Sequence, residues 1–217
     1  MQQDMHKEAI LILHNALTCF QSRVFSLDVG MFGSPSNFSP KLETVGVGIT
    51  TGCIITTEEC RNMFRLFNEA FLFQPGLHTG NLENLQVQSA VLLFNMALAH
   101  QKHGLKFCDS ESLFSALRLY RAGLDVMEQI GTNASIEPDV RGDLNHLLLA
   151  LLNNLGHLHF YFVDRPSVIR CGEILSFVLS TGDVSKTATE NPEFLQYMTT
   201  LVLSFDSSQI LAASPAA

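Results

Sequence analysis

The stretch LFNMALAHQKHG, residues 93–104, places apolar side chains on one side of a helix and ends at a glycine. Two other stretches align with it without gaps, namely LHNALTCF at residues 13–20 and LNNLGHLH at residues 152–159. Each carries a leucine, an asparagine two positions later, and an aromatic side chain or a histidine seven positions after the leucine. Self-similarity of this kind predicts a chain built from repeated helical units.

The helices that follow these stretches repeat a second pattern. Ala116, Tyr120 and Gly123 place a small side chain, an aromatic ring and another small side chain at successive spacings of four and three. Met63, Phe67 and Ala70 share this spacing, and Cys171, Leu175 and Val178 match it loosely. Such spacings put the three side chains of each set on one helix face, where small residues let two helices approach closely. The pattern predicts stacked helical hairpins.

These paired helices resemble tetratricopeptide repeats. Residues 93–104 together with ALRLYRAGL, residues 116–124, look like one repeat with about seven extra residues between its helices. NLGHLH, residues 154–159, is similar to the first helix of another repeat, and residues 5–23 and 57–73 resemble a pair split by a long loop. The unequal loops also resemble uncharacterised repeat proteins of diatoms, a group that brings no assigned activity.

The resemblance implies an all-α fold of antiparallel helix hairpins stacked in a right-handed superhelix, with about three pairs plus a C-terminal helix. We expect a single domain over residues 1–205 and a disordered tail over residues 206–217. Five glycines and two prolines mark residues 26–56 as a long loop insertion. Residues 45–57, at the end of that loop, are rich in β-branched side chains and predict a short extended piece.

Apolar spacing and capping residues predict the individual helices. Thr57 followed by two glutamates opens a helix over residues 58–74, and Pro75-Gly76 ends it. The other helices are expected over residues 5–25, 82–103, 110–131, 138 to the break at 164–166, 166–181 and 192–205.

Charge and hydropathy argue against nucleic acid and membrane as partners. The net charge is −8, and the 13 basic residues form no extended run, so the chain lacks the footprint of a phosphate binder. The N-terminal residues carry no uninterrupted apolar core, so we expect no secretory signal. Residues 147–163 are mostly apolar, but four polar side chains interrupt them, namely Asn153, Asn154, His157 and His159. Each of these side chains would cost free energy to place in a lipid bilayer. We expect a buried helix of a soluble protein.

Metal and cofactor sites are not indicated. The five cysteines form no C-x-x-C pair, which favours reduced thiols in a cytoplasmic protein, with the nucleus as the alternative. His100 and His103 lie three residues apart, but no cysteine or carboxylate completes a ligand set. GVGITTG, residues 46–52, lacks the strand and helix that frame a phosphate loop. We therefore expect no metal and no cofactor.

The three aligned asparagines, Asn15, Asn95 and Asn154, are interpreted as structural. A repeated polar residue inside a helical hairpin usually bonds a backbone group between helices, because a buried amide needs partners.

The resemblance also assigns a binding surface, since the first helix of each hairpin lines the concave groove of such superhelices. The residues that this projection places in the groove are His14, Thr18, Phe94, Leu98, Gln101, Lys102, Asn153, His157, Phe160 and Tyr161. Lys102 is the only fixed charge among them, so a peptide with apolar side chains fits the surface better than a free carboxylate. The expected function is a non-catalytic scaffold that binds a peptide or a partner protein.

Three alternatives stay open at this point. In the first alternative, the groove residues pack against a neighbouring helix or the long loop and bind no partner. The second is an enzyme with an unrecognised site near His157, although no catalytic motif is present. The third is a structural protein that associates with itself through exposed apolar helix faces.

Overall fold

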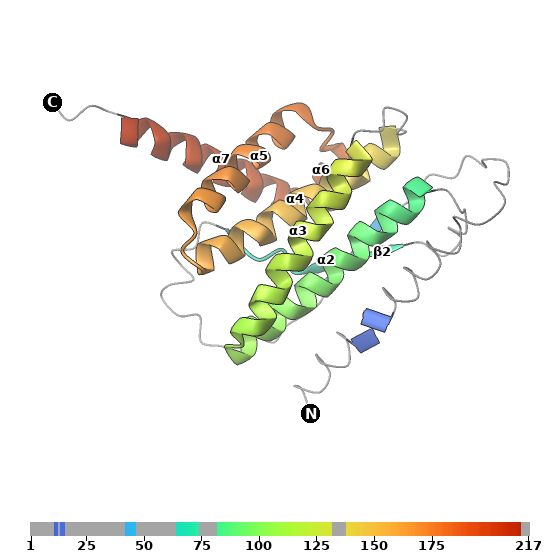
Figure 1. Ribbon diagram of the computed structural model, residues 1–217. Helices are drawn as coiled ribbons and strands as arrows, with labels where there is room; N and C mark the ends of the chain where they lie inside the picture. The colour runs from blue at the N-terminus through green and yellow to red at the C-terminus, as the bar shows by residue number, and fades with distance from the viewer. Residues whose placement is uncertain are drawn as a thin grey trace. The chain divides into compact units, whose positions relative to one another are not determined.

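The computed structural model describes residues 11–12, 14–15, 42–46, 64–73, 82–131 and 138–213. These residues are mostly helical, which confirms the predicted all-α character (Figure 1). Residues 11–12 and 14–15 are helical and belong to the first expected helix, whose other residues lie outside the described part.

The chain divides into two compact units, which are described separately below. Unit 1 comprises Met1–Ile54 and Asn68–Val140, and unit 2 comprises Ile55–Phe67 and Arg141–Ala217. One boundary therefore falls inside the described segment 64–73, which gives its first four residues to unit 2 and its last six to unit 1.

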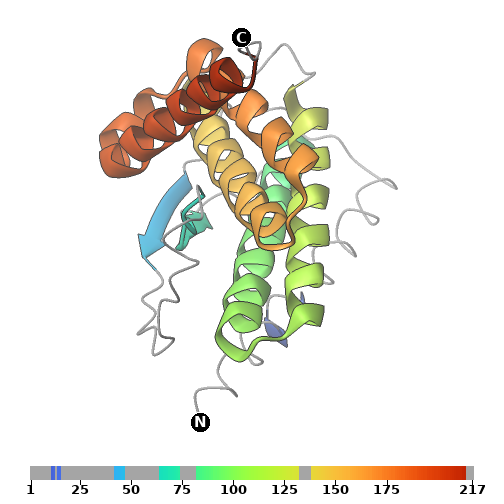
Figure 2. The ribbon, with the colours of Figure 1, turned by 90° about the vertical axis from the view of Figure 1, so that its left-hand side faces the viewer.

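Unit 1 is built on two long helices, α2 (Leu82–Phe107) and α3 (Ser110–Gly131), which pack side by side (Figure 2). Apolar and aromatic side chains spaced along both helices fill the contact, among them Phe94, Ala97, Leu113, Ala116 and Tyr120. Strands β1 (Leu42–Gly46) and β2 (Glu69–Phe73) pair antiparallel with Thr44 opposite Phe71. β2 also lies against α2.

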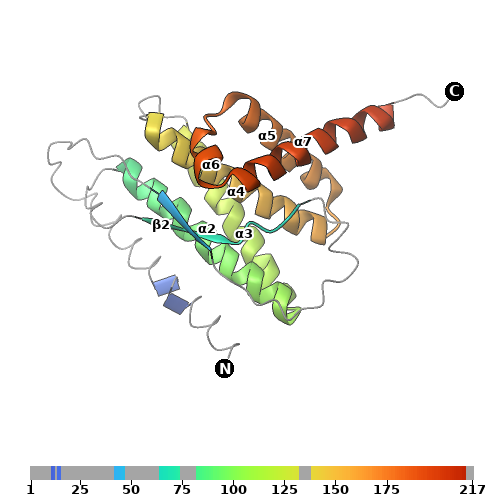
Figure 3. The ribbon, with the colours of Figure 1, turned by 180° about the vertical axis from the view of Figure 1, so that it is seen from behind.

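Unit 2 contains most of α4 (Pro138–Tyr161), followed by α5 (Arg165–Thr181), α6 (Ser185–Glu190) and α7 (Pro192–Ala213). Both α5 and α6 contact α7 (Figure 3). Residues 149–159 of α4 are buried without a break, which confirms most of the buried helix expected over residues 147–163. The helix ends at Tyr161, however, and both Tyr161 and Val163 are exposed. The polar side chains within residues 149–159 are buried too, and each needs a partner.

The α2–α3 and α4–α5 pairs are joined by turns of the same kind. Cys108 and Val163 adopt the left-handed region, with φ of 53° and 59°, and each precedes an aspartate that begins the next helix. The carboxylate of Asp109 accepts from the Ser112 hydroxyl, and that of Asp164 accepts from the Ser167 backbone N–H. In both turns the aspartate backbone N–H donates to a carbonyl five residues earlier, which closes the preceding helix.

The helix predicted over residues 58–74 is wrong wherever this segment is described. Residues 64–68 form neither helix nor strand, and residues 69–73 form β2. The prediction rested on Thr57 and on the spacing of Met63, Phe67 and Ala70, and it failed because the buried side chains are Phe64, Phe67 and Phe71, whose separations of three and four also mimic a helix face. Thr57, the expected cap, lies outside the described residues.

The remaining described helices agree with the prediction except at the end of α2 and near the C-terminus. α2 continues through Gly104, its expected end, to Phe107. The short helix α6 occupies a stretch expected to be a connection, and α7 continues to Ala213 instead of ending near residue 205. The expected extended piece over residues 45–57 overlaps β1 only at Val45 and Gly46, and its other residues lie outside the described part.

Candidate functional site

Two aligned asparagines hold the backbone of the segment Phe64–Phe73. In unit 2, the Phe67 N–H donates to Asn154 Oδ1 at 2.8 Å, and Asn154 Nδ2 donates to the Phe67 carbonyl at 2.9 Å. In unit 1, the Phe71 N–H donates to Asn95 Oδ1 at 3.0 Å, and Asn95 Nδ2 donates to the Phe71 carbonyl at 2.8 Å. Each amide thus satisfies both backbone groups of one residue.

A hydrogen-bond network in unit 2 extends this recognition to Arg65. The Arg65 N–H donates to the Tyr197 hydroxyl, and Asn153 Nδ2 donates to the Arg65 carbonyl at 2.6 Å. Tyr197 donates in turn to Asn153 Oδ1 at 3.5 Å, and Asn153 Nδ2 also donates to Asn154 Oδ1 at 3.1 Å. Burial raises the pKa of Tyr197 to about 12, so its hydroxyl keeps its proton at neutral pH.

The geometry of an extended chain explains why Arg65 and Phe67 are held together. Residues two apart in an extended segment present their N–H and C=O groups on the same edge. Asn153, Asn154 and Tyr197 supply donors and acceptors along that edge, so side chains of α4 and α7 take the place of a neighbouring β-strand. Because these contacts reach only backbone atoms, they are indifferent to the side chains at both positions.

Aromatic contacts in unit 2 recognise the side chains of the same segment. The Phe67 ring lies 4.6 Å from the Phe194 ring and 5.8 Å from the His146 ring, measured between centroids. The Phe64 ring lies 5.7 Å from the Phe205 ring and directly over Gly156, where an added Cβ would come within 2.3 Å of it. Glycine at position 156 therefore leaves the space that a flat ring fills.

Unit 1 holds the second half of the segment in a similar way. The Phe71 and Phe94 rings meet edge to face at 5.1 Å. The backbone N–H and C=O of Phe71 bond Asn95. In an antiparallel pair, alternate residues of a strand bond the partner strand, so the neighbours of Phe71 in β2 are the ones that bond β1. Lys102 Nζ donates to the Asn68 carbonyl at 3.3 Å, and burial lowers the pKa of Lys102 to about 8.

The residues predicted to line the groove fall into four groups. Phe94, Leu98, Gln101, Lys102, Asn153 and His157 are buried. His14 and Tyr161 are exposed, Phe160 is half-buried, and Thr18 lies outside the described residues. Asn153 and Lys102 contact the segment 64–73 directly, whereas Gln101 accepts from the Tyr120 hydroxyl at 2.8 Å between α2 and α3.

Two buried histidines of unit 2 are held in the neutral form. Burial lowers the pKa of His146 and of His157 to about 4. His146 contacts the rings of Phe67 and Phe194, so it acts as an aromatic packing residue beside the segment.

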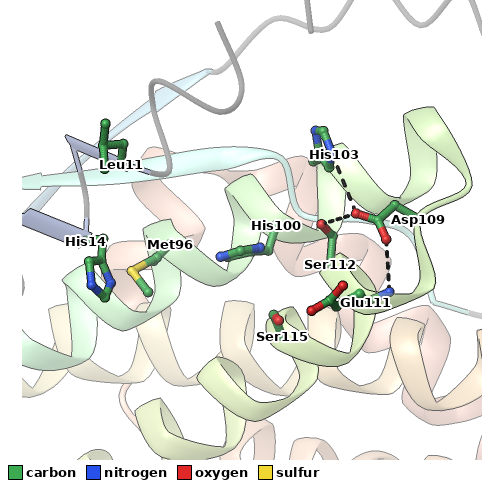
Figure 4. Close-up of a pocket in the computed structure, with 9 residues that line it drawn as sticks. All are labelled: Leu11, His14, Met96, His100, His103, Asp109, Glu111, Ser112 and Ser115. Carbon is green, nitrogen blue, oxygen red and sulfur yellow. Dashed lines mark hydrogen bonds and ion pairs between the residues drawn. The ribbon is translucent and has the colours of Figure 1, made fainter. Parts of the chain in front are cut away.

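A separate open pocket of about 510 Å³ lies in unit 1 (Figure 4). At one end His103 Nε2 approaches Asp109 Oδ2 at 3.7 Å, and Ser112 donates to the same oxygen at 2.7 Å. His14 and Met96 line the opposite end, with His100 between the two (Figure 4). The carboxylate of Asp109 is engaged in beginning α3, and within the described ranges no three His, Cys, Asp or Glu side chains form a cluster fit for a metal ion.

The sequence predicts some of the residues that contact the segment Phe64–Phe73. Asn95 and Asn154 were recognised as equivalent and expected to bond backbone groups, but the backbone they bond belongs to an extended segment and not to a neighbouring helix. Asn15 is exposed on its helix. The sequence does not predict the roles of Tyr197 and Phe194, because nothing in it relates α7 to residues 64–67, and it does not predict that Gly156 of α4 receives the Phe64 ring.

Comparisons with known proteins return no match to any family model, curated protein or solved structure. A search of the described helices finds none with the length and apolarity needed to cross a bilayer.

Proposed function

We propose that this protein is a non-catalytic interaction scaffold that binds an extended peptide segment of a partner protein. The observation that carries the proposal is the pairing of Asn154 with both backbone groups of Phe67, repeated by Asn95 and Phe71. Backbone pairing supplies affinity for an extended chain while pockets for alternate side chains supply specificity, which is a recurring mode of peptide recognition.

We further propose that α2–α3 and α4–α5 are successive tetratricopeptide-like hairpins of a right-handed superhelix. Support comes from the aligned asparagines on α2 and α4 and from the shared turn with its left-handed residue and capping aspartate. An experimental structure in which the α4–α5 pair does not stack on the α2–α3 pair would contradict this arrangement.

A peptide library displayed on phage and selected against the full-length protein tests the binding function. In a background that weakens the chain's own segment, Phe67→Leu for Asn154 and Phe71→Leu for Asn95, enriched peptides should lose at least about tenfold in affinity when Asn154→Ala or Asn95→Ala is added, because each asparagine substitution removes two backbone hydrogen bonds to the peptide. Circular dichroism checks that each variant stays helical. Failure to enrich any peptide, or an affinity that neither asparagine substitution lowers, would contradict a peptide-binding role for these asparagines.

A further inference from the structure

We infer that unit 2 carries an acceptor surface for a partner peptide of the pattern Phe-Arg-x-Phe in an extended conformation, and that Phe64–Phe67 occupies this surface as an intramolecular competitor. The acceptor surface consists of Asn153, Asn154, Gly156, Phe194 and Tyr197. The inference rests on the proposed peptide-binding function and specifies its ligand.

The backbone contacts define the conformation of the ligand. Arg65 and Phe67 occupy the second and fourth positions, and both give their N–H and C=O groups to side chains of α4 and α7. A helical peptide has no free backbone groups in its interior, so it cannot make these bonds. The surface therefore selects an extended chain.

The first and fourth positions define the side chains that the surface prefers. Phe64 and Phe67 keep 1% and 5% of their surface exposed, so both rings are enclosed. The Phe64 ring sits over Gly156, and the Phe67 ring lies against Phe194. A branched aliphatic side chain is thicker than a flat ring, so we expect it to fit the space over Gly156 poorly.

The second position prefers a cation. The Arg65 guanidinium lies 5.3 Å from the centre of the Tyr197 ring, within the range of a cation–π contact. Arg65 is exposed and Leu66 is half-buried, so neither position encloses its side chain as the first and fourth positions do.

The resident segment sets the conditions under which a partner binds. A covalently attached competitor acts at an effective concentration on the order of millimolar, so it masks the surface from a weak free peptide. A substitution that weakens only the resident segment should therefore strengthen the binding of a free peptide. This is the signature that separates a competitor from a permanent part of the core.

The probe is a fluorescein-labelled peptide with the sequence of residues 62–69, NMFRLFNE, titrated into full-length protein and followed by polarisation. Phe67→Leu should bind it about tenfold more tightly than wild type. The substitution replaces a buried ring by a smaller side chain, which weakens the resident segment as a competitor. Arg65→Ala should bind it about threefold more tightly, because it removes only the exposed contact with Tyr197 and leaves the enclosed rings in place. Asn145→Ala should match wild type, because Asn145 of α4 donates to the Asp183 carbonyl and not to the segment 64–67.

Methylated peptides test the backbone contacts without altering the protein. N-methylation at the position of Phe67 removes the N–H that Asn154 accepts and should abolish binding, whereas N-methylation at Leu66 should leave binding within about threefold. Equal binding to wild type and both segment variants, or equal loss with both methylated peptides, would overturn the inference. A dimer detected by light scattering without binding of the free peptide would also overturn it, since the occupant would then be a second copy of the chain.

Failure of the Phe-Arg-x-Phe ligand can be distinguished from failure of the proposed peptide-binding function. A protein that selects library peptides without the two phenylalanines, yet loses them in Asn154→Ala, keeps its peptide-binding role and refutes only the Phe-Arg-x-Phe ligand.

Discussion

The side-chain amide of Asn154 pairs with both backbone polar groups of Phe67, although 87 residues separate the two in the chain. A buried extended residue next to helices has no neighbouring strand to bond, and helix backbones have no groups to spare. One amide carries a donor and an acceptor at the separation that an extended residue presents. Asn95 does the same for Phe71, which shows why the two aligned helices carry the same residue.

Replacing Asn154 by alanine should destabilise unit 2 by roughly 2–4 kcal/mol, because it leaves the buried N–H and C=O of Phe67 without partners. Asn145→Ala is the matched control on the same helix, since Asn145 donates to the Asp183 carbonyl in an exposed setting. We expect its cost to stay below about 1 kcal/mol. Urea denaturation followed by circular dichroism measures both, and equal losses would argue against a buried backbone contact.

Gly156→Ala should destabilise the protein by about 1–3 kcal/mol, because the new Cβ meets the Phe64 ring and forces it to move. Gly131→Ala serves as the control, since a Cβ there meets nothing within 4 Å and alanine favours a helix. In a Phe64→Ala background the cost of Gly156→Ala should largely disappear. A double-mutant cycle by thermal or urea unfolding measures this coupling, and additive effects would show that the ring does not occupy this space.

Stability should fall as the pH drops from 6.5 toward 4. His146 and His157 have a pKa of about 4 in the fold, against 6.5 for an exposed histidine, so the unfolded chain binds protons over this range and the folded one does not. Each histidine contributes up to about 3 kcal/mol that is fully present above pH 6.5 and lost by about pH 4. Urea midpoints between pH 7.5 and 4.5 should show a slope that is shallower in His146→Gln. An unchanged slope would contradict burial of a neutral His146.

Lys102 should make the protein more stable as the pH rises from about 8 to 10.5. Its pKa is lowered by burial to about 8 in the fold, from 10.5 for an exposed lysine, so between these values only the unfolded chain holds the proton. Lys102→Met should therefore gain about 1–3 kcal/mol at neutral pH and lose this pH dependence. Stability that falls in the variant would indicate that the bond to the Asn68 carbonyl outweighs the cost of burying the charge.

Most of the helices could be predicted from the sequence, because local signals mark their ends. Ser110, Pro138 and Pro192 begin α3, α4 and α7 as expected. The segment 64–73 could not be predicted in this way. Its buried phenylalanines follow helical spacing, and its extended state depends on partners in β1, α2 and α4 that are remote in sequence.

The candidate site was predictable only in part, for a similar reason. The aligned positions of Asn95 and Asn154 identify residues that bond a backbone, but the identity of that backbone is a tertiary property. Lys102 and Asn153 were expected to face a partner peptide, and in the structure they contact the chain's own segment. Gly156 lies in one of the aligned stretches without a predicted role, and in the structure it makes room for Phe64.

Amide hydrogen exchange at Phe67 and Phe71 tests most directly that the two asparagines hold the extended segment. Resolved by NMR, the Phe67 amide should lose protection in Asn154→Ala while the Phe71 amide keeps it, and Asn95→Ala should give the reverse. Protection that is unchanged at both amides in both variants, or lost equally at both, would contradict the account.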